Sequence, residues 1–146
     1  MTVAGQYLTF RLGDEEYGVE ILAVQEIKGG AAITPIPGTP PHVRGVMNLR
    51  GTILPVVDLR ARLGGGAGGA GPFPVIVVVR IGERMVGLLV DAVSDVVELA
   101  AADIQPAPAL GPQAGARIVS GIGQAGERLV VLLDAGEVLE GAGALS

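Results

Sequence analysis

The sequence predicts an all-β fold made of two similar halves, and three observations support this prediction. Short apolar runs rich in Val, Ile and Leu are separated by turns such as 13–14, 82–83 and 125–126. Helical periodicity is sparse. The two halves of the chain also share an internal repeat. Together these features are typical of small β-sandwiches or β-barrels.

Eight segments are expected to form strands. The run 75–81 is mostly β-branched, which suits a strand buried on both faces. Segment 7–12 instead alternates apolar and polar residues, as a half-buried strand does. The full set of expected strands is 7–12, 43–49, 52–57, 75–81, 84–90, 93–99, 117–122 and 128–133.

Two short helices are expected at 58–63 and 135–140, with Asp58 and Asp134 as their N-caps. Between the halves, Gly64 to Gly71 holds six glycines in eight residues and predicts a flexible connector. We therefore expect a single domain over 1–146, with approximate halves 1–71 and 72–146.

The internal repeat consists of two blocks in the same order. In the first block the offset is 69 residues and in the second it is 76. The first block pairs Gly18 with Gly87, Val24 with Val93 and Glu26 with Asp95; the second pairs Gly45 with Gly121, Ile53–Asp58 with Leu129–Asp134 and Leu63 with Leu139. The repeat favours duplication, although chance similarity in a chain rich in Gly, Val and Leu is the alternative, and strand exchange between the halves stays open. A cleft between two such halves is a common place for binding.

Composition narrows the function classes. The net charge is −5 and Lys28 is the single lysine, whereas nucleic-acid binding usually needs a basic face. The chain has no cysteine, which fits a reducing cytosol. No apolar run approaches the ~18 residues that cross a bilayer. We therefore expect a cytoplasmic protein that neither binds nucleic acid nor inserts directly into a membrane.

Catalytic and metal-binding residues are scarce. His42 is the only histidine, so a zinc site would have to rely on carboxylates. The two matches to a dinucleotide-binding glycine pattern, 66–71 and 121–126, lack the strand and helix that such a loop needs. The acidic run Asp14 to Glu16 is expected to be a solvated hairpin turn. The sequence thus predicts no catalytic site, no metal and no cofactor.

The segment Asn48 to Arg60 closely resembles the signature of the CheW family, an Asn-Leu-Arg-Gly turn followed by an apolar strand that ends in Val-Asp-Leu-Arg. Other stretches agree in the same order, so the resemblance covers about 7–140. They are Gly13–Val19, Val24–Ile27, Gly87–Asp91, Val93–Val96 and Ile104–Pro108.

The resemblance implies two SH3-like, five-stranded β-barrel subdomains packed around a shared hydrophobic core, with short helices. It implies a non-catalytic adaptor without a cofactor, which couples the cytoplasmic tips of methyl-accepting chemoreceptors to the regulatory domain of the histidine kinase CheA. Other CheW copies are further candidate partners, and the protein would reach membrane arrays through its partners. The alternatives are a CheW-like adaptor of a motility or second-messenger pathway and a small β-barrel ligand-binding protein.

The resemblance also implies a receptor- or kinase-binding site. In its groove, Val24 and Val93 occupy equivalent positions of the two halves, so both halves would line one cleft. A place in the core is the alternative for each valine. Arg50 is expected to hold a backbone carbonyl or a carboxylate at the groove with its rigid fork of hydrogen-bond donors, and a solvated turn residue is the alternative. The complete expected set is Val24, Glu26, Ile27, Gly45, Arg50, Gly51, Val75, Gly87, Val93 and Val96.

Overall fold

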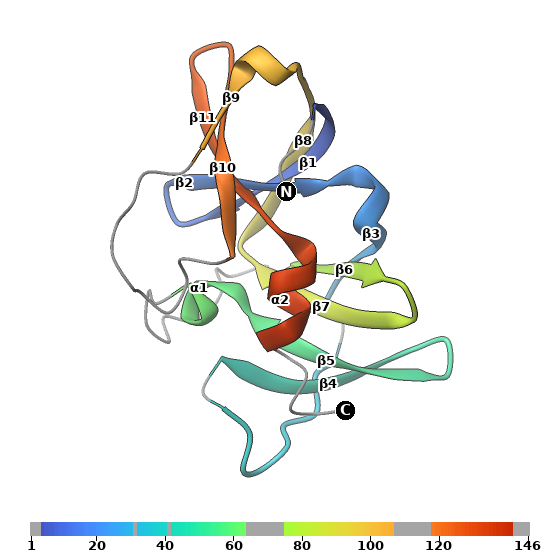
Figure 1. Ribbon diagram of the computed structural model, residues 1–146. Helices are drawn as coiled ribbons and strands as arrows, with labels where there is room; N and C mark the ends of the chain where they lie inside the picture. The colour runs from blue at the N-terminus through green and yellow to red at the C-terminus, as the bar shows by residue number, and fades with distance from the viewer. Residues whose placement is uncertain (1–3, 31, 41, 64–74, 107–117, 142–146) are drawn as a thin grey trace.

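The computed structural model describes residues 4–30, 32–40, 42–63, 75–106 and 118–141 (Figure 1). Strands dominate, and the helices are short. The strands are β1 (Gly5–Leu12), β2 (Glu15–Glu20), β3 (Val24–Gly29), β4 (Val43–Leu49), β5 (Thr52–Asp58), β6 (Val75–Ile81), β7 (Arg84–Val90), β8 (Ala92–Leu99), β9 (Ile104–Gln105), β10 (Val119–Ala125) and β11 (Arg128–Leu133). The helices are α1 (Leu59–Arg62) and α2 (Ala135–Gly141), with 3-10 turns η1 (Ile21–Ala23) and η2 (Ala101–Asp103).

The strands form two sheets, each the basis of one lobe. The six-stranded lobe has the order β8-β1-β2-β11-β10-β9, and the five-stranded lobe has the order β3-β6-β7-β5-β4. Each sheet takes strands from both sides of residue 71, because β1 and β2 join β8 to β11 while β6 and β7 join β3 to β5. Figure 1 shows the β4–β5 hairpin at the bottom and the β10–β11 hairpin at the top.

Apolar side chains pack in three clusters, one of which is shared by both lobes. The shared cluster contains Phe10 and Val19 from the six-stranded lobe with Val77 and Leu88 from the five-stranded lobe. Two smaller clusters each fill one lobe. Strand β6 alternates between them: Val77 joins the shared cluster and Val78 joins the cluster of its own lobe. The prediction of two barrel-like subdomains around a common core is confirmed.

The eight expected strands are present, with ends shifted by a few residues. The expected helices are α1 and α2. The Oδ1 of Asp58 accepts a hydrogen bond from the N–H of Ala61, and the Oδ1 of Asp134 accepts one from the N–H of Glu137. Both aspartates therefore act as the expected N-caps. The glycine-rich stretch 64–71 lies outside the described residues.

Strands β2, β3 and β9 were not expected from the sequence. In β2 the acidic start and Gly18 obscure the pattern, and in β3 the polar residues Gln25, Glu26 and Lys28 do the same. Strand β2 pairs with its neighbour β1 across a hairpin turn and also runs parallel to the distant β11, and β3 runs antiparallel to the distant β6. Tertiary context thus outweighs local strand propensity here.

Candidate functional site

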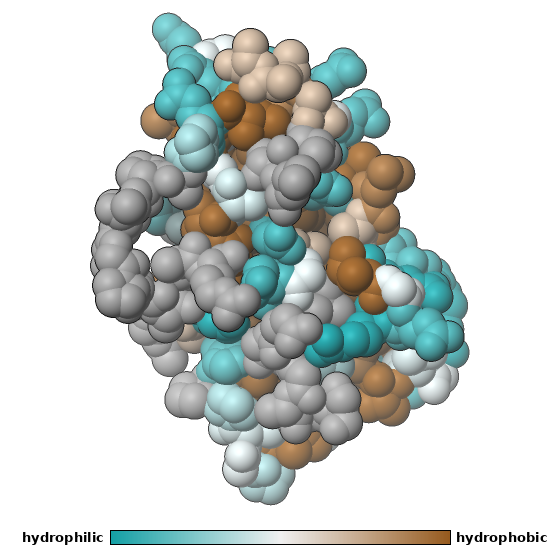
Figure 2. All heavy atoms as spheres, viewed as in Figure 1, coloured by the Kyte–Doolittle hydropathy of each residue, from teal (hydrophilic) through white to brown (hydrophobic). Residues whose placement is uncertain are grey.

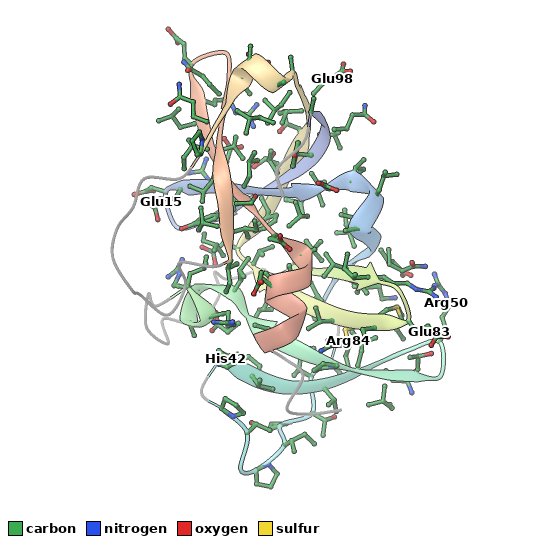
Figure 3. The ribbon with its side chains drawn as sticks, viewed as in Figure 1. Glu15, His42, Arg50, Glu83, Arg84 and Glu98 are labelled. Atoms are coloured by element: carbon green, nitrogen blue, oxygen red, sulfur yellow. The ribbon has the colours of Figure 1, made fainter. Side chains whose placement is uncertain are left out.

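Glu26 and Arg50, two of the expected site residues, form an ion pair. The Nη1 of Arg50 lies 2.7 Å from the Oε1 of Glu26, and the Nζ of Lys28 lies 3.6 Å from its Oε2. The side chain of Glu26 is 19% exposed and that of Arg50 is 73% exposed. Figure 3 shows Arg50 extending from the tip of the β4–β5 hairpin. The pair therefore compensates the charge of the largely buried carboxylate and joins the edge strand β3 to this hairpin.

The turn that carries Arg50 has an unusual backbone. Arg50 has a φ of 52° and Gly51 a φ of 90°, so two successive residues are in the left-handed region. The Oδ1 of Asn48 accepts a hydrogen bond of 2.9 Å from the N–H of Gly51. Hairpin turns of this kind favour Asn or Gly at both central positions, and an arginine costs about 1 kcal/mol there. A strained arginine at a hairpin tip is typical of a functional position.

Apolar site residues divide into an exposed pair and a half-buried group. Ile27 is 44% exposed and Val96 is 46% exposed, and they occupy equivalent positions on the edge strands β3 and β8. Val24, Val75 and Val93 are half-buried and pack against the shared core. That Val24 and Val93 line one groove stays a prediction, while Ile27 and Val96 are accessible to a partner.

Gly45 and Gly87 are both positions without room for a side chain. A Cβ on Gly45 would collide with the carbonyl of Thr34, whose segment forms a β-bridge with Val46. A Cβ on Gly87 would lie 2.7 Å from the Cγ2 of Ile76, inside the core of the five-stranded lobe. Both glycines therefore serve packing, and Gly51 instead serves the turn, because its Cβ would meet nothing within 4 Å.

A second ionic site was missed by the sequence reasoning. Arg128 forms ion pairs with Glu16 and with Asp95. The expectation that Asp14 to Glu16 is a solvated turn is wrong for Glu15 and Glu16, which already belong to β2. Glu16 also accepts two hydrogen bonds from Arg128. The internal repeat could have indicated this site. Asp95 is the repeat equivalent of Glu26, so a second carboxylate paired with an arginine could be expected at that position.

The charges at this second site perturb one another. The hydrogen bond from Arg128 holds the pKa of Glu16 below its ordinary value. Hydrogen bonds from Arg128 and then Thr9 lower the pKa of Asp95 to about 2. The carboxylates in turn raise the pKa of Arg128, first through the hydrogen bond to Glu16. Both acids are therefore ionised at neutral pH.

The described surface carries several pockets lined by both polar and apolar side chains. A cavity of about 200 Å³ lies between the lobes and is lined by Tyr7 and Ser120 on one side and Ile81 on the other. Other pockets are larger, about 340 Å³ beside η2 and β10 and about 500 Å³ beside the β1–β2 turn, which is within the range of small-molecule sites. Among the described residues, no group of three His, Cys, Asp or Glu side chains is placed to hold a metal ion. On the face in Figure 2, apolar side chains form several separate groups among polar ones.

Residues 6–142 match the family described as CheW-like domain. The chain belongs to the CheW family. It is 42% identical over 138 residues to the chemotaxis protein CheW of Klebsiella aerogenes, covering 94% of this chain and 83% of that protein. It is 48% identical over 116 residues to the chemotaxis protein CheW of Rhizobium meliloti, covering 74% of this chain and 75% of that protein.

The fold agrees with this membership. The crystal structure of the scaffolding protein TtCheW from Thermoanaerobacter tengcongensis superposes with a TM-score of 0.82 at 33% identity, and the match covers 90% of each chain. Family, relatives and fold together identify a chemotaxis adaptor of the scaffold type. In the part of the chain that the structure describes, no helix has the length and apolar character needed to cross a membrane.

Proposed function

We propose that this adaptor couples methyl-accepting chemoreceptors to the regulatory domain of the kinase CheA, without catalysis of its own and without a cofactor. It acts in the cytoplasm at receptor arrays, which it reaches through its partners, and it binds neither nucleic acid nor the bilayer itself. The Glu26–Arg50 pair is the observation that carries the proposal. It places a largely exposed, strained arginine beside an edge strand whose Ile27 is also exposed.

The receptor tip is the partner that this surface suits best. A receptor tip is a helical hairpin, and a helix docks by apolar anchors supported by a few polar contacts. Ile27 on β3 and Val96 on β8 offer apolar anchors, and Arg50 offers a guanidinium with five N–H donors, one of which makes the contact to Glu26. Arginine is also among the residues most often found at energetic hot spots.

The kinase contact is assigned to the ends of the two lobes. Ile53 on β5 is 60% exposed and Leu129 on β11 is 63% exposed, and the repeat makes these positions equivalent. They lie in the β4–β5 and β10–β11 hairpins, at opposite ends of the molecule (Figure 1). A large aliphatic side chain exposed to this extent at both ends supports a partner at each end, either the kinase regulatory domain or another CheW copy.

The test is binding of a purified receptor fragment by co-sedimentation. Arg50→Ala is expected to retain its circular dichroism spectrum and to lose about tenfold or more in affinity, as for other hot-spot arginines. Arg44→Ala is the matched control: Arg44 lies on β4 of the same hairpin, its side chain is half-exposed, and like Arg50 it forms an ion pair with a carboxylate, that of Asp58. Unfolding of Arg50→Ala, or unchanged binding, contradicts the assignment of Arg50.

The two surfaces can be separated in the same assay. Leu129→Glu is expected to weaken kinase-domain binding and to leave receptor binding within about twofold, because Leu129 lies on β11 of the six-stranded lobe and Arg50 belongs to the other lobe. Arg50→Ala is expected to do the reverse. A wild-type protein that sediments with neither partner overturns the proposed function as a whole.

A further inference from the structure

Four neighbouring strands of the six-stranded lobe contribute one polar side chain each to a single cluster. Thr9 comes from β1, Glu16 from β2, Asp95 from β8 and Arg128 from the start of β11. We call these four residues the Arg128 cluster. Because the strand order is β8-β1-β2-β11, the cluster extends across the sheet from its edge strand to its centre.

Arg128 holds two carboxylates at once. Its Nε and Nη2 donate to the two oxygens of Glu16 at 2.9 and 2.5 Å. Its Nη1 and Nη2 donate to the two oxygens of Asp95 at 3.1 and 2.9 Å. A planar guanidinium can make two such two-point contacts, and a lysine ammonium cannot. The arginine therefore links β2 to β8 across the intervening strand β1.

Thr9 completes the cluster at an irregularity of the edge strand. Leu8 pairs with Val96 and Phe10 pairs with Val93, so two residues of β8 oppose Thr9 alone. The Oγ1 of Thr9 accepts a hydrogen bond of 3.2 Å from the N–H of Asp95 and lies 2.7 Å from its Oδ1. A bulge leaves a backbone N–H without its partner in the neighbouring strand. Here the Thr9 hydroxyl accepts the hydrogen bond of the Asp95 N–H instead.

We propose that Arg128 is a positioning residue for β8, which fixes the bulge and thereby the exposed Val96 that a receptor contacts. The inference rests on the proposed function for the identity of the partner. Strand β8 is an edge strand with a ladder to β1 on one side only, and the contacts of Asp95 with Arg128 and Thr9 add further ties at its bulge. Asp95 lies next to Val96, so a carboxylate fixed by Arg128 and Thr9 also fixes the orientation of the neighbouring side chain.

The first measurement is hydrogen–deuterium exchange of β8 in the free protein. Arg128→Ala is expected to speed exchange of the β8 amides about tenfold, as expected when charge-assisted hydrogen bonds are lost. Arg128→Lys restores the charge without the fork and is expected to recover part of the protection. High salt is expected to speed exchange in the wild type and to have little further effect in Arg128→Ala, since salt weakens ion pairs.

The second measurement is affinity for the receptor fragment in the same variants. Arg128→Ala is expected to weaken binding about three- to tenfold, with Arg128→Lys between it and the wild type. Thr9→Val tests the bulge without changing charge and is expected to loosen β8 in the same way. Arg80→Ala is the matched control: Arg80 lies on β6 of the other lobe, and its Nε donates to the carbonyl of Gly82, so neither readout should change.

The outcomes separate the two proposals. Unchanged exchange in Arg128→Ala overturns the positioning role directly. Faster exchange of β8 with undiminished receptor affinity overturns it as well, because the position of β8 would then not matter for binding. Failure of the wild type to bind the receptor fragment overturns the proposed function instead, and the exchange data still decide whether Arg128 fixes β8.

Discussion

Two arginine–carboxylate sites occupy corresponding places in the two lobes and differ in construction. Glu26 and Asp95 are equivalent in the repeat, and each lies on an edge strand at a shift in strand register. Each is paired with an arginine from a hairpin, Arg50 from β4–β5 and Arg128 from β10–β11. The side chain of Arg50 is 73% exposed, whereas that of Arg128 is 41% exposed and contacts two carboxylates.

The difference indicates a division of labour between related surfaces. Arg50 makes one short contact from a strained turn, and most of its guanidinium faces solvent. Arg128 donates hydrogen bonds to Glu16 and Asp95, both of which lie in the same sheet as Arg128. The same arrangement thus presents an arginine in one lobe and anchors an edge strand in the other. The following predictions test this contrast, from the largest expected effect to the smallest.

The largest effect is expected from a pair of equivalent glycines, one in each lobe. Gly87 and Gly18 each lie where β7 or β2 runs parallel to a strand from the other half. A Cβ on Gly87 would lie 2.7 Å from Ile76, and a Cβ on Gly18 would lie 3.1 Å from Val130. Gly87→Ala is therefore expected to lower the free energy of unfolding by about 1–3 kcal/mol through overpacking.

Gly18→Ala is expected to cost less, because its neighbour needs to move by only a few tenths of an ångström and the unfolded state loses entropy. Urea unfolding of both variants measures the difference. Gly29→Ala is the control, since no atom lies within 4 Å of its Cβ position. Equal destabilisation of the two lobes by Gly87→Ala and Gly18→Ala would contradict tighter packing in the five-stranded lobe.

The next effect contrasts the two arginines directly. Arg128→Ala is expected to destabilise the protein by about 1 kcal/mol, at the low end for hydrogen bonds to charged groups because the site is partly exposed. Arg50→Ala is expected to change stability by less than about 0.5 kcal/mol, as for most exposed ion pairs. Thermal unfolding with both variants tests the ranking. A larger loss for Arg50→Ala would reverse the assignment of presenting and anchoring roles.

This contrast also shows what the sequence could and could not predict. The β-branched run 75–81 predicted a strand buried on both faces, and Asp58 and Asp134 predicted the starts of two helices. These predictions succeeded because each depends only on residues that are adjacent in the sequence. Glu26 and Arg50 could be selected from the family resemblance. The pairing of Arg128 with Glu16 joins residues 112 positions apart and depends on the parallel contact of β2 with β11, which no local pattern specifies.

A smaller effect is expected from acid. The pKa of Asp95 is lowered to about 2 and that of Glu16 is lowered, so both acids bind protons less readily in the folded than in the unfolded protein. Their stabilising contribution is complete above the unfolded values near pH 4 and is lost as pH falls toward about 2. The stability difference between wild type and Arg128→Ala is therefore expected to shrink across this window.

Chemical unfolding at several pH values measures that difference. Arg80→Ala serves as the control, because the Nε of Arg80 donates to the backbone carbonyl of Gly82, a contact that involves no acid. A difference between wild type and Arg128→Ala that stays constant from neutral pH to about pH 2 would show that the carboxylates of this cluster do not contribute through their charge.

The smallest effect is expected from Arg50→Asn, and it has the opposite sign. Asparagine tolerates the φ of 52° better than arginine, and an Asn-Gly turn is the preferred sequence for such a hairpin. Relief of strain is expected to raise stability by about 0.5 kcal/mol after the loss of the exposed ion pair to Glu26 is subtracted. Receptor binding is expected to fall as in Arg50→Ala, because asparagine cannot reach a partner as the guanidinium does.

Unfolding and co-sedimentation of the same preparation test both the stability and the binding of Arg50→Asn. A variant that is both less stable and fully active would mean that this turn is shaped for folding, so that the exposed arginine would no longer distinguish the five-stranded lobe from its counterpart.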